Sequence, residues 1–187
     1  MVCAPSILRA MSDRKGRLLV ATAFVICSAM NLVAIGEEMQ VVSSVDLSRY
    51  QGRWFDVARL PLRWEDKCAS DVTATYTLRP DSKVDVLNQC KKADGTQTQS
   101  RGTARVATKE GSNAKLKVSV FWPFAGDYWI LDLDPEYRWA LVGTPNKKNL
   151  WVLSRNSKLG KDVLDRLVGH ADQLGFDTAK MIWTKQD

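Results

Sequence analysis

Apolar and polar residues alternate along a series of short runs between residues 52 and 155 of the 187-residue chain. In the run from Trp54 to Leu60, alternate residues would share a face of a strand, and both faces are mostly apolar, which predicts a strand covered on both sides. The runs are rich in Val, Thr, Leu, Tyr and Trp and are separated by Gly, Pro, Asn and Asp, as is typical of strands joined by turns. The predicted strands are 52–60, 71–79, 83–90, 97–107, 114–121, 127–133, 137–143 and 149–155.

Short, turn-like connections join these runs, as in Arg79-Pro80-Asp81. Eight strands in chain order with hairpin links predict an all-β fold, an antiparallel up-and-down barrel whose closure removes the exposed edges. Apolar residues then recur at helical spacing from Val163 to Leu174, and Gly175 follows them. We expect this amphipathic helix to pack on the outside of the barrel, with a short final strand at 180–184 after it. The outward-facing aromatic residues that would receive the helix are Phe55, Trp129 and Trp139.

Small and aliphatic residues occupy the side of several strands that we assign to the barrel interior. An eight-stranded barrel is just wide enough to hold one small ligand, and a wall of Ala, Gly and Val leaves space for it. The residues predicted to line this cavity are Ala58, Val72, Ala74, Tyr76, Val86, Asn88, Ala104, Val118, Val120 and Tyr128. Tyr76, Asn88 and Tyr128 would offer hydrogen bonds to a ligand or serve only in packing. The alternative to a cavity is a solid core filled by Trp and Tyr.

Residues 1–36 have the pattern of a secretory signal or membrane-targeting segment, which leaves 37–187 as the folded domain. A basic stretch precedes an apolar one from Leu18 to Ile26, and small residues at Ala34 and Gly36 suit a cleavage site. The same segment is near the length of a membrane-spanning helix, so an uncleaved anchor is an alternative. Cys27 is a candidate lipidation site, although the bulky Ile26 before it suits that modification poorly.

Two cysteines, Cys68 and Cys90, flank the predicted hairpin around residues 79–81. In an antiparallel pair of strands both would fall at the end far from the turn, with a bulge or loose end absorbing a small offset in register. An exported protein with such a pair is expected to form a disulfide. Two reduced, buried thiols are the alternative.

Charge and candidate chemistry favour a binding protein. The net charge is +6, but the basic pairs Lys91-Lys92 and Lys147-Lys148 form no stripe, so no nucleic-acid partner is predicted. The only histidine, His170, falls on the predicted helix, and the sequence offers no histidine pair for a metal. Asp56 shares a predicted face with Trp54 and would be either a paired structural carboxylate, which we favour, or a polar residue of the cavity. We therefore predict no enzymatic activity, no metal and no cofactor.

Three regions of the chain, in order, resemble the conserved regions of the lipocalin family. Gly52-Arg53-Trp54 matches its G-x-W signature, "LDLDPEYRWALVG" (131–143) its second region and "LWVLSR" (150–155) its third. The resemblance covers about residues 45–185 and is to the bacterial lipocalin and apolipoprotein D branch. It implies that Trp54 closes the bottom of the barrel and that Arg155 packs across it, with Gly52 allowing close packing. These three residues would then be structural.

The same resemblance implies a lipid or other amphiphilic ligand, such as a fatty acid or a lysophospholipid. Burial of its acyl chain would contribute roughly 0.8 kcal/mol per CH₂ group. It also implies an exported protein of the periplasm or outer membrane. The alternatives are a membrane-attached structural or partner-binding barrel without a lipid ligand, and an enzyme built on the lipocalin fold.

Overall fold

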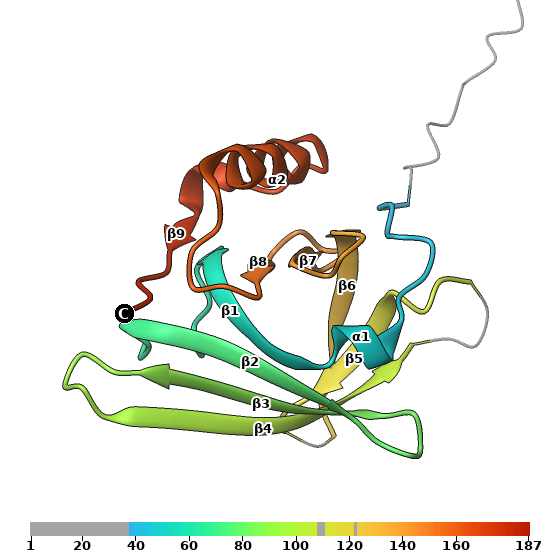
Figure 1. The fold of residues 1–187 in the computed structure, drawn as a ribbon, viewed down its shortest axis with the longest axis horizontal. Coiled ribbons are helices and arrows are strands. Elements are labelled where there is room, and N and C mark those ends of the chain that lie inside the picture. Colours follow the sequence, from blue (N-terminus) through green and yellow to red (C-terminus); the bar gives the residue numbers. More distant parts are fainter. Residues whose placement is uncertain (1–37, 108–110, 122) are drawn as a thin grey trace, which may run out of the picture. The chain divides into compact units, whose positions relative to one another are not determined.

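Eight antiparallel strands follow one another in chain order in the computed structural model, which describes residues 38–107, 111–121 and 123–187 (Figure 1). The strands are β1 (Gly52–Arg59), β2 (Ser70–Leu78), β3 (Val84–Lys91), β4 (Gln97–Val106), β5 (Lys115–Ser119), β6 (Gly126–Leu133), β7 (Trp139–Gly143) and β8 (Leu150–Ser154). Each pairs with the next, and β1 pairs with both β8 and β2, which closes the sheet into a barrel. This confirms the predicted fold. The predicted targeting segment 1–36, including Cys27, lies outside the described residues.

Two helices and a ninth strand accompany the barrel. The longer helix, α2 (Lys161–Gln173), lies outside the strands (Figure 1) and is followed by a 3-10 turn, η1 (Thr178–Lys180), and the extra strand β9 (Ile182–Trp183). The short helix α1 (Leu47–Tyr50) precedes β1 and was not expected from the sequence. Asp46 caps its N-terminus, because the Asp46 side chain accepts hydrogen bonds from the backbone N–H groups of Ser48 and Arg49. None of the helices among the described residues is long and apolar enough to cross a membrane.

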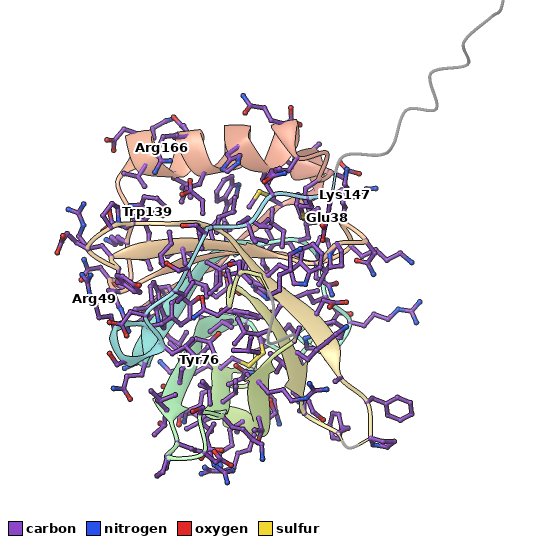
Figure 2. The ribbon with its side chains drawn as sticks, turned by 90° about the vertical axis from the view of Figure 1, so that its right-hand side faces the viewer. Glu38, Arg49, Tyr76, Trp139, Lys147 and Arg166 are labelled. Carbon is purple, nitrogen blue, oxygen red and sulfur yellow. A yellow bond between two sulfur atoms is a disulfide. The ribbon has the colours of Figure 1, made fainter. Side chains whose placement is uncertain are left out.

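Because neighbouring strands run in opposite directions, the connections alternate between the two ends of the barrel. We call the end that carries the connections after β1, β3, β5 and β7 the mouth. The opposite end carries α1 and the turn between β6 and β7, and we call it the closed end. The disulfide Cys68–Cys90, with 5.6 Å between its Cα atoms, ties the connection after β1 to β3 at the mouth (the yellow bond in Figure 2). The predicted disulfide is therefore confirmed.

A β-bulge in β1 reverses which side chains face the barrel interior. Asp56 lies opposite Leu153 of β8, but two residues later Ala58 lies opposite Val152 and Arg59 opposite Trp151. The extra residue places Ala58 in the apolar cluster beneath α2, so the prediction that it lines the cavity is wrong. Strict alternation from Trp54 had assigned it inward, whereas the bulge turns Arg59 to the interior instead.

The apolar side of α2 packs on the outside of β7, β8 and β1. The fully buried Leu167 and Ala171 of the helix meet Leu141 and Val152 of the barrel. Arg166 lies over the ring of Trp139, 4.6 Å from its centre (Figure 2). The side chains inside the barrel form a second apolar cluster, and no residue of α2 belongs to it.

The C-terminal tail bridges β1 and β2 near the mouth, where these two strands separate. Their pairing ends at Phe55 and Thr73, and beyond it β9 pairs with β1. The backbone N–H of Asp71 then donates to the carbonyl of Lys185 (2.9 Å). The side chain of Gln186 donates to the carbonyls of Asp56 and Val72 at 2.7 and 2.9 Å. The tail thus completes the barrel wall at the mouth.

Candidate ligand-binding site

Trp54 and Arg155 meet at the closed end of the barrel. Trp54 is fully buried and donates from its indole N–H to the carbonyl of Tyr50 in α1 (2.8 Å). Gly52 has a positive φ of 97°, and a Cβ there would lie 3.2 Å from a guanidinium nitrogen of Arg155. The structure therefore brings Gly52, Trp54 and Arg155 together, and the glycine is needed both for its backbone conformation and for the close approach.

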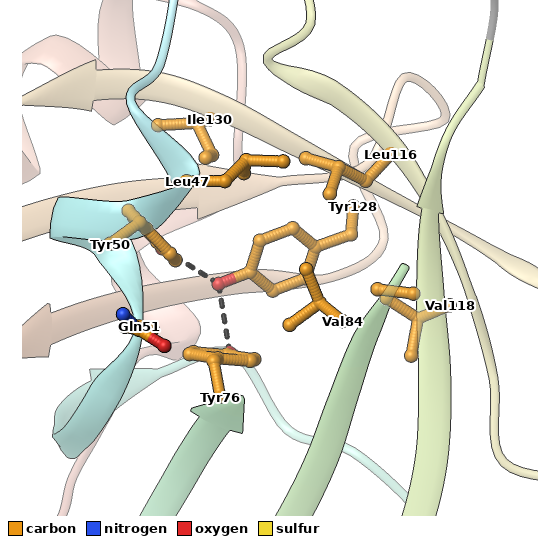
Figure 3. A pocket seen from close by; sticks show the side chains of 10 residues that line it. Leu47, Tyr50, Gln51, Tyr76, Val84, Leu116, Val118, Tyr128 and Ile130 are labelled. Carbon is orange, nitrogen blue, oxygen red and sulfur yellow. Dashed lines mark hydrogen bonds between the residues drawn. The ribbon is translucent and has the colours of Figure 1, made fainter. Parts of the chain in front are cut away.

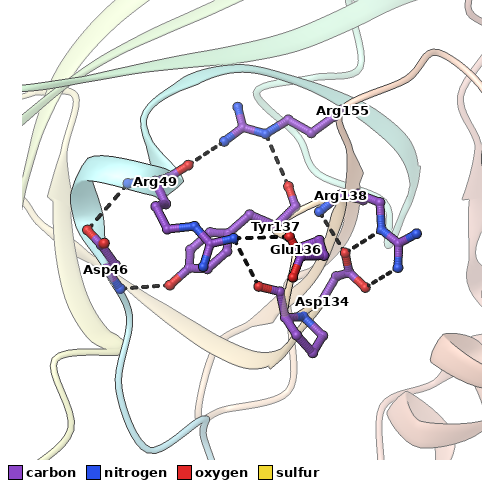
Figure 4. A network of polar contacts seen from close by, with 8 residues as sticks. Asp46, Arg49, Asp134, Glu136, Tyr137, Arg138 and Arg155 are labelled. Atoms are coloured by element: carbon purple, nitrogen blue, oxygen red, sulfur yellow. Dashed lines mark hydrogen bonds and ion pairs between the residues drawn. The ribbon is translucent and has the colours of Figure 1, made fainter.

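The Arg155 guanidinium donates hydrogen bonds to backbone carbonyls of two segments at this end. It donates to the carbonyls of Gln51 (2.9 Å) and Arg53 (3.0 Å). It also donates to the carbonyl of Arg49 (2.8 Å) and, from Nε, to that of Tyr137 (3.2 Å) (Figure 4). The phenol group of Tyr137 in turn accepts from the backbone N–H of Asp46, which caps α1. These bonds fix α1 across the end of the barrel and separate its interior from solvent there.

The interior cavity described by the structure lies just inside this closed end and measures about 20 Å³. Its walls are Leu47, Tyr50, Gln51, Tyr76, Val84, Ala104, Leu116, Val118, Tyr128 and Ile130 (Figure 3). Four of the predicted cavity residues, Tyr76, Ala104, Val118 and Tyr128, are among them. A cavity of this size holds about one water molecule. Packing therefore fills most of the space beside α1.

Three tyrosines meet at this cavity, inside the closed end. The hydroxyl of Tyr128 lies 2.8 Å from that of Tyr50 and 2.9 Å from that of Tyr76 (Figure 3). Burial raises the pKa of Tyr76 to about 12 and raises the pKa values of Tyr50 and Tyr128 well above their ordinary value. All three hydroxyls are therefore protonated at neutral pH. The hydrogen bonds expected from Tyr76 and Tyr128 toward a ligand are made within this trio.

The other predicted cavity residues occupy different surroundings. Val72 and Val86 are buried, and Ala74 packs against the interior cluster. Asn88 is half-buried and lies opposite Ala74 in the β2–β3 register. Val86 and Val120 also border an open hollow along β2–β5, whose walls include Thr75, Leu87 and Arg101. The predicted set is thus split between the cavity, the interior wall and positions that border the open hollow.

A buried ionic cluster lies in the mouth half of the interior, and sequence reasoning missed it. Arg59 is 5% exposed; its Nε lies 2.8 Å from a carboxylate oxygen of Glu65, and a terminal nitrogen lies 3.7 Å from Asp56. The Thr184 hydroxyl links Arg59 to Asp56: it accepts a hydrogen bond from Arg59 at 2.8 Å and donates one to Asp56 at 3.1 Å. Strict alternation from Trp54 assigns Arg59 to the outer face of β1. The cluster could have been predicted only if the sequence had indicated the bulge in β1.

Burial governs the protonation of these carboxyl groups. It raises the pKa of Asp56 to about 7, aided by the negative charge of Glu65 and opposed by Arg59 and Thr184. Burial also raises the pKa of Glu65, while Arg59 and the indole groups of Trp151 and Trp64 lower it. Asp56 is buried and bonded to the tail, as expected for a structural carboxylate, yet it also faces the interior.

Comparison with known proteins identifies similar chains. A family model described as a lipocalin-like domain matches residues 45–186. Outer membrane lipoprotein Blc of Escherichia coli (strain K12) is 42% identical over 147 residues, covering 78% of this chain and 82% of the relative. Apolipoprotein D of Macaca fascicularis is 32% identical over 155 residues, covering 79% and 80%. The solved structure of insecticyanin from the tobacco hornworm Manduca sexta has a TM-score of 0.62 at 24% identity, covering 79% and 84%, and supports the fold.

Proposed function

The chain belongs to the lipocalin family, whose members bind small hydrophobic ligands, and we propose that it binds a single-chain amphiphile inside its barrel. The proposed ligand is a fatty acid or a lysophospholipid. The observation that carries the proposal is the gradient along the interior: the closed end is sealed by Trp54 and Arg155 and lined by aliphatic and uncharged tyrosine side chains, whereas charged groups lie toward the mouth. This gradient suits an acyl chain that enters first and a polar headgroup that stays near the mouth.

Ligand entry requires the tyrosine trio to move, because the cavity of about 20 Å³ is far smaller than an acyl chain. Burying ten methylene groups contributes roughly 8 kcal/mol at about 0.8 kcal/mol each. Breaking the two hydroxyl contacts of Tyr128 costs about 1–3 kcal/mol each when the acyl chain leaves the hydroxyls without partners. The gain exceeds this cost, so a filled interior is compatible with binding. Val118, Ala104 and Val86 are small enough to form the wall around a bound chain.

The proposed site of action is the cell envelope. The relative from Escherichia coli is called an outer membrane lipoprotein, which supports an exported protein of the periplasm or outer membrane. Residues 1–36 would supply the export signal or anchor, and Cys27 remains a candidate for lipidation. A binding role, rather than catalysis, is supported by the family and by the position of His170. Its Nδ1 lies 3.4 Å from Asp132, on the outer side of the barrel.

Native mass spectrometry of the purified protein with a panel of fatty acids and lysophospholipids tests this proposal. We expect a one-to-one adduct that is lost in Val118→Trp, because the indole would fill the cavity. Lys117→Trp is the matched control, since Lys117 neighbours Val118 but belongs to the opposite face of β5 and pairs with Asp127. An adduct that survives Val118→Trp, or is lost equally in both variants, contradicts binding in the interior.

A second candidate function is a membrane-attached or partner-binding barrel without a lipid ligand. The small size of the described cavity favours it, as do three large aromatic side chains exposed at the mouth. Trp64, Phe121 and Phe124 are 58%, 75% and 77% exposed. The absence of any adduct in the experiment above would make this the better proposal.

A further inference from the structure

We propose that Arg59 recognises the anionic headgroup of the ligand and that Glu65 is its exchangeable counter-ion. A carboxylate or phosphate headgroup would bind by displacing the Glu65 carboxylate from Arg59. This inference rests on the proposed function, because it names the headgroup chemistry of the same ligand. It makes the protein selective for anionic amphiphiles over neutral ones of equal chain length.

Arg59 is placed to meet a headgroup whose acyl chain fills the closed half of the interior. It lies opposite Trp151 in the β1–β8 register. The Trp151 ring stacks with that of Tyr128 at 6.3 Å between centres, and Tyr128 lines the cavity. The charges of Glu65 and Asp56 act on the Tyr76 hydroxyl, where they add to the rise in its pKa caused by burial. Trp151, opposite Arg59, and Tyr128, on the cavity wall, therefore connect the ionic cluster to the cavity.

Glu65 is the group best placed to leave. It belongs to the connection between β1 and β2, and its four neighbours from Arg63 to Lys67 are all exposed, whereas Glu65 alone turns inward. The segment is held by two backbone hydrogen bonds around this residue, from Glu65 to Leu62 and from Cys68 to Glu65, both of 2.8 Å. A rotation of 63–67 would withdraw the carboxylate while the buried Leu62 and the disulfide at Cys68 kept the ends in place.

Asp56, in contrast, is fixed. It lies within a paired strand, its carboxylate accepts from Thr184, and its carbonyl accepts from Gln186. Exchange of an external carboxylate for that of Glu65 leaves the charge inside the barrel unchanged, since one carboxylate replaces another beside Arg59. A neutral headgroup would either leave Arg59 paired with Glu65 or strand a buried guanidinium without a counter-ion, which is unfavourable.

The geometry of the Arg59–Glu65 contact leaves room for a better partner. Arg59 Nε and the Glu65 oxygen lie 2.8 Å apart, yet neither atom has a correctly directed hydrogen bond among the described residues. Arginine binds carboxylate and phosphate most strongly through two parallel hydrogen bonds. A headgroup on a flexible chain can adopt that orientation, whereas a carboxylate attached to the short connection does not.

Binding of three ligands with the same sixteen-carbon chain tests the proposal: hexadecanoate, hexadecyl phosphate and hexadecanol, with affinities measured by quenching of Trp fluorescence. For the wild type we expect either anion to bind about tenfold or more tightly than the alcohol. Glu65→Gln should tighten both anions and leave the alcohol nearly unchanged, because the internal competitor loses its charge. Asp66→Asn, one residue away and exposed, is the matched control and should change nothing.

Arg59→Met should abolish the preference for anions while the alcohol still binds. If that variant fails to fold, Arg59→Lys decides, because lysine keeps the charge but loses the paired hydrogen bonds and should reduce the preference. An unchanged preference in either Arg59 variant, or weaker anion binding in Glu65→Gln, overturns the inference. Failure of all three ligands to bind the wild type contradicts the proposed function itself and is thus distinguishable.

Discussion

The guanidinium of Arg155 lies 3.9 Å from the centre of the Trp54 ring and at the same time donates to carbonyls of α1 and the start of β1. Lysine carries the same charge but cannot reach these acceptors from one plane. Arg155→Lys should therefore lower the free energy of unfolding by about 1–3 kcal/mol, measured by urea denaturation. Arg53→Lys is the control, because Arg53 is exposed and lies over Phe55 only; an equal loss in both variants would contradict the assigned role.

Gly143 lies where the barrel meets the segment after α2. A Cβ at this position would lie 2.6 Å from the ring of Phe176 and 2.9 Å from Leu131. Gly143→Ala should destabilise the protein by about 1–3 kcal/mol because both neighbours are buried. Gly169→Ala in α2, where a Cβ would meet no atom within 4 Å, should instead stabilise it by roughly 0.5–1 kcal/mol. Thermal denaturation of both variants checks the opposite signs.

The Tyr128 hydroxyl is the centre of the interior trio, so its removal affects two partners. Tyr128→Phe leaves the hydroxyls of Tyr50 and Tyr76 without their shared contact, and should cost about 2 kcal/mol or more of unfolding free energy. Tyr76→Phe keeps the bond between Tyr50 and Tyr128 and should cost about 1 kcal/mol. Equal losses, measured by urea denaturation, would mean that the trio does not act as a network.

Asp56 makes the stability depend on pH. Its pKa rises from 3.8 to about 7 on folding, because of burial first and the Glu65 charge second. Between these two values the folded state holds a proton that the unfolded chain has lost, so the free energy of unfolding falls as pH rises through this window. Arg59, Glu65, Thr184 and Gln186 face this residue.

Asp56→Asn has no proton to lose and should remove part of that fall. Urea denaturation of both proteins at pH 5 and pH 8 gives the comparison, and we expect the wild type to lose up to a few kcal/mol more than the variant. Identical pH dependence in the two proteins would show that Asp56 does not titrate in this window.

The disulfide closes a loop with a sequence separation of 22 between Cys68 and Cys90. A cross-link over this length stabilises a protein by about 3 kcal/mol, mainly by restricting the unfolded chain. Cys68→Ser combined with Cys90→Ser should lower the unfolding free energy by about this amount. Dithiothreitol should destabilise the wild type similarly and leave the double variant unaffected.

Much of the fold could be read from local pattern. Alternating runs between turn residues gave the strands, and their order and short links gave the up-and-down barrel. The apolar spacing from Val163 to Leu174 gave the outer helix. The helix α1 was not predicted, because its four residues contain no periodic pattern. It is stabilised by Asp46 and by Arg155, which is distant in sequence.

The candidate site was predicted less completely. Small residues at alternate positions predicted Ala104 and Val118 as cavity walls, and both line the described cavity. The volume of the cavity, however, depends on every side chain that surrounds it. The surrounding side chains, including the three tyrosines whose hydroxyls meet at Tyr128, leave a cavity of only about 20 Å³. The sequence gives each side chain a face, whereas the space that remains depends on how side chains from six or more segments pack together.

The sequence by itself determined the strand number, the barrel, the disulfide partners and the family. Only the tertiary structure decided the inward turn of Arg59, the outward turn of Ala58 and the meeting of Arg59 with Glu65 and Thr184. The reason is physical: side-chain direction in a strand has a period of two, so one extra residue reverses every later position. Whether that residue is accommodated as a bulge is settled by pairing with β8, about a hundred residues away in the chain.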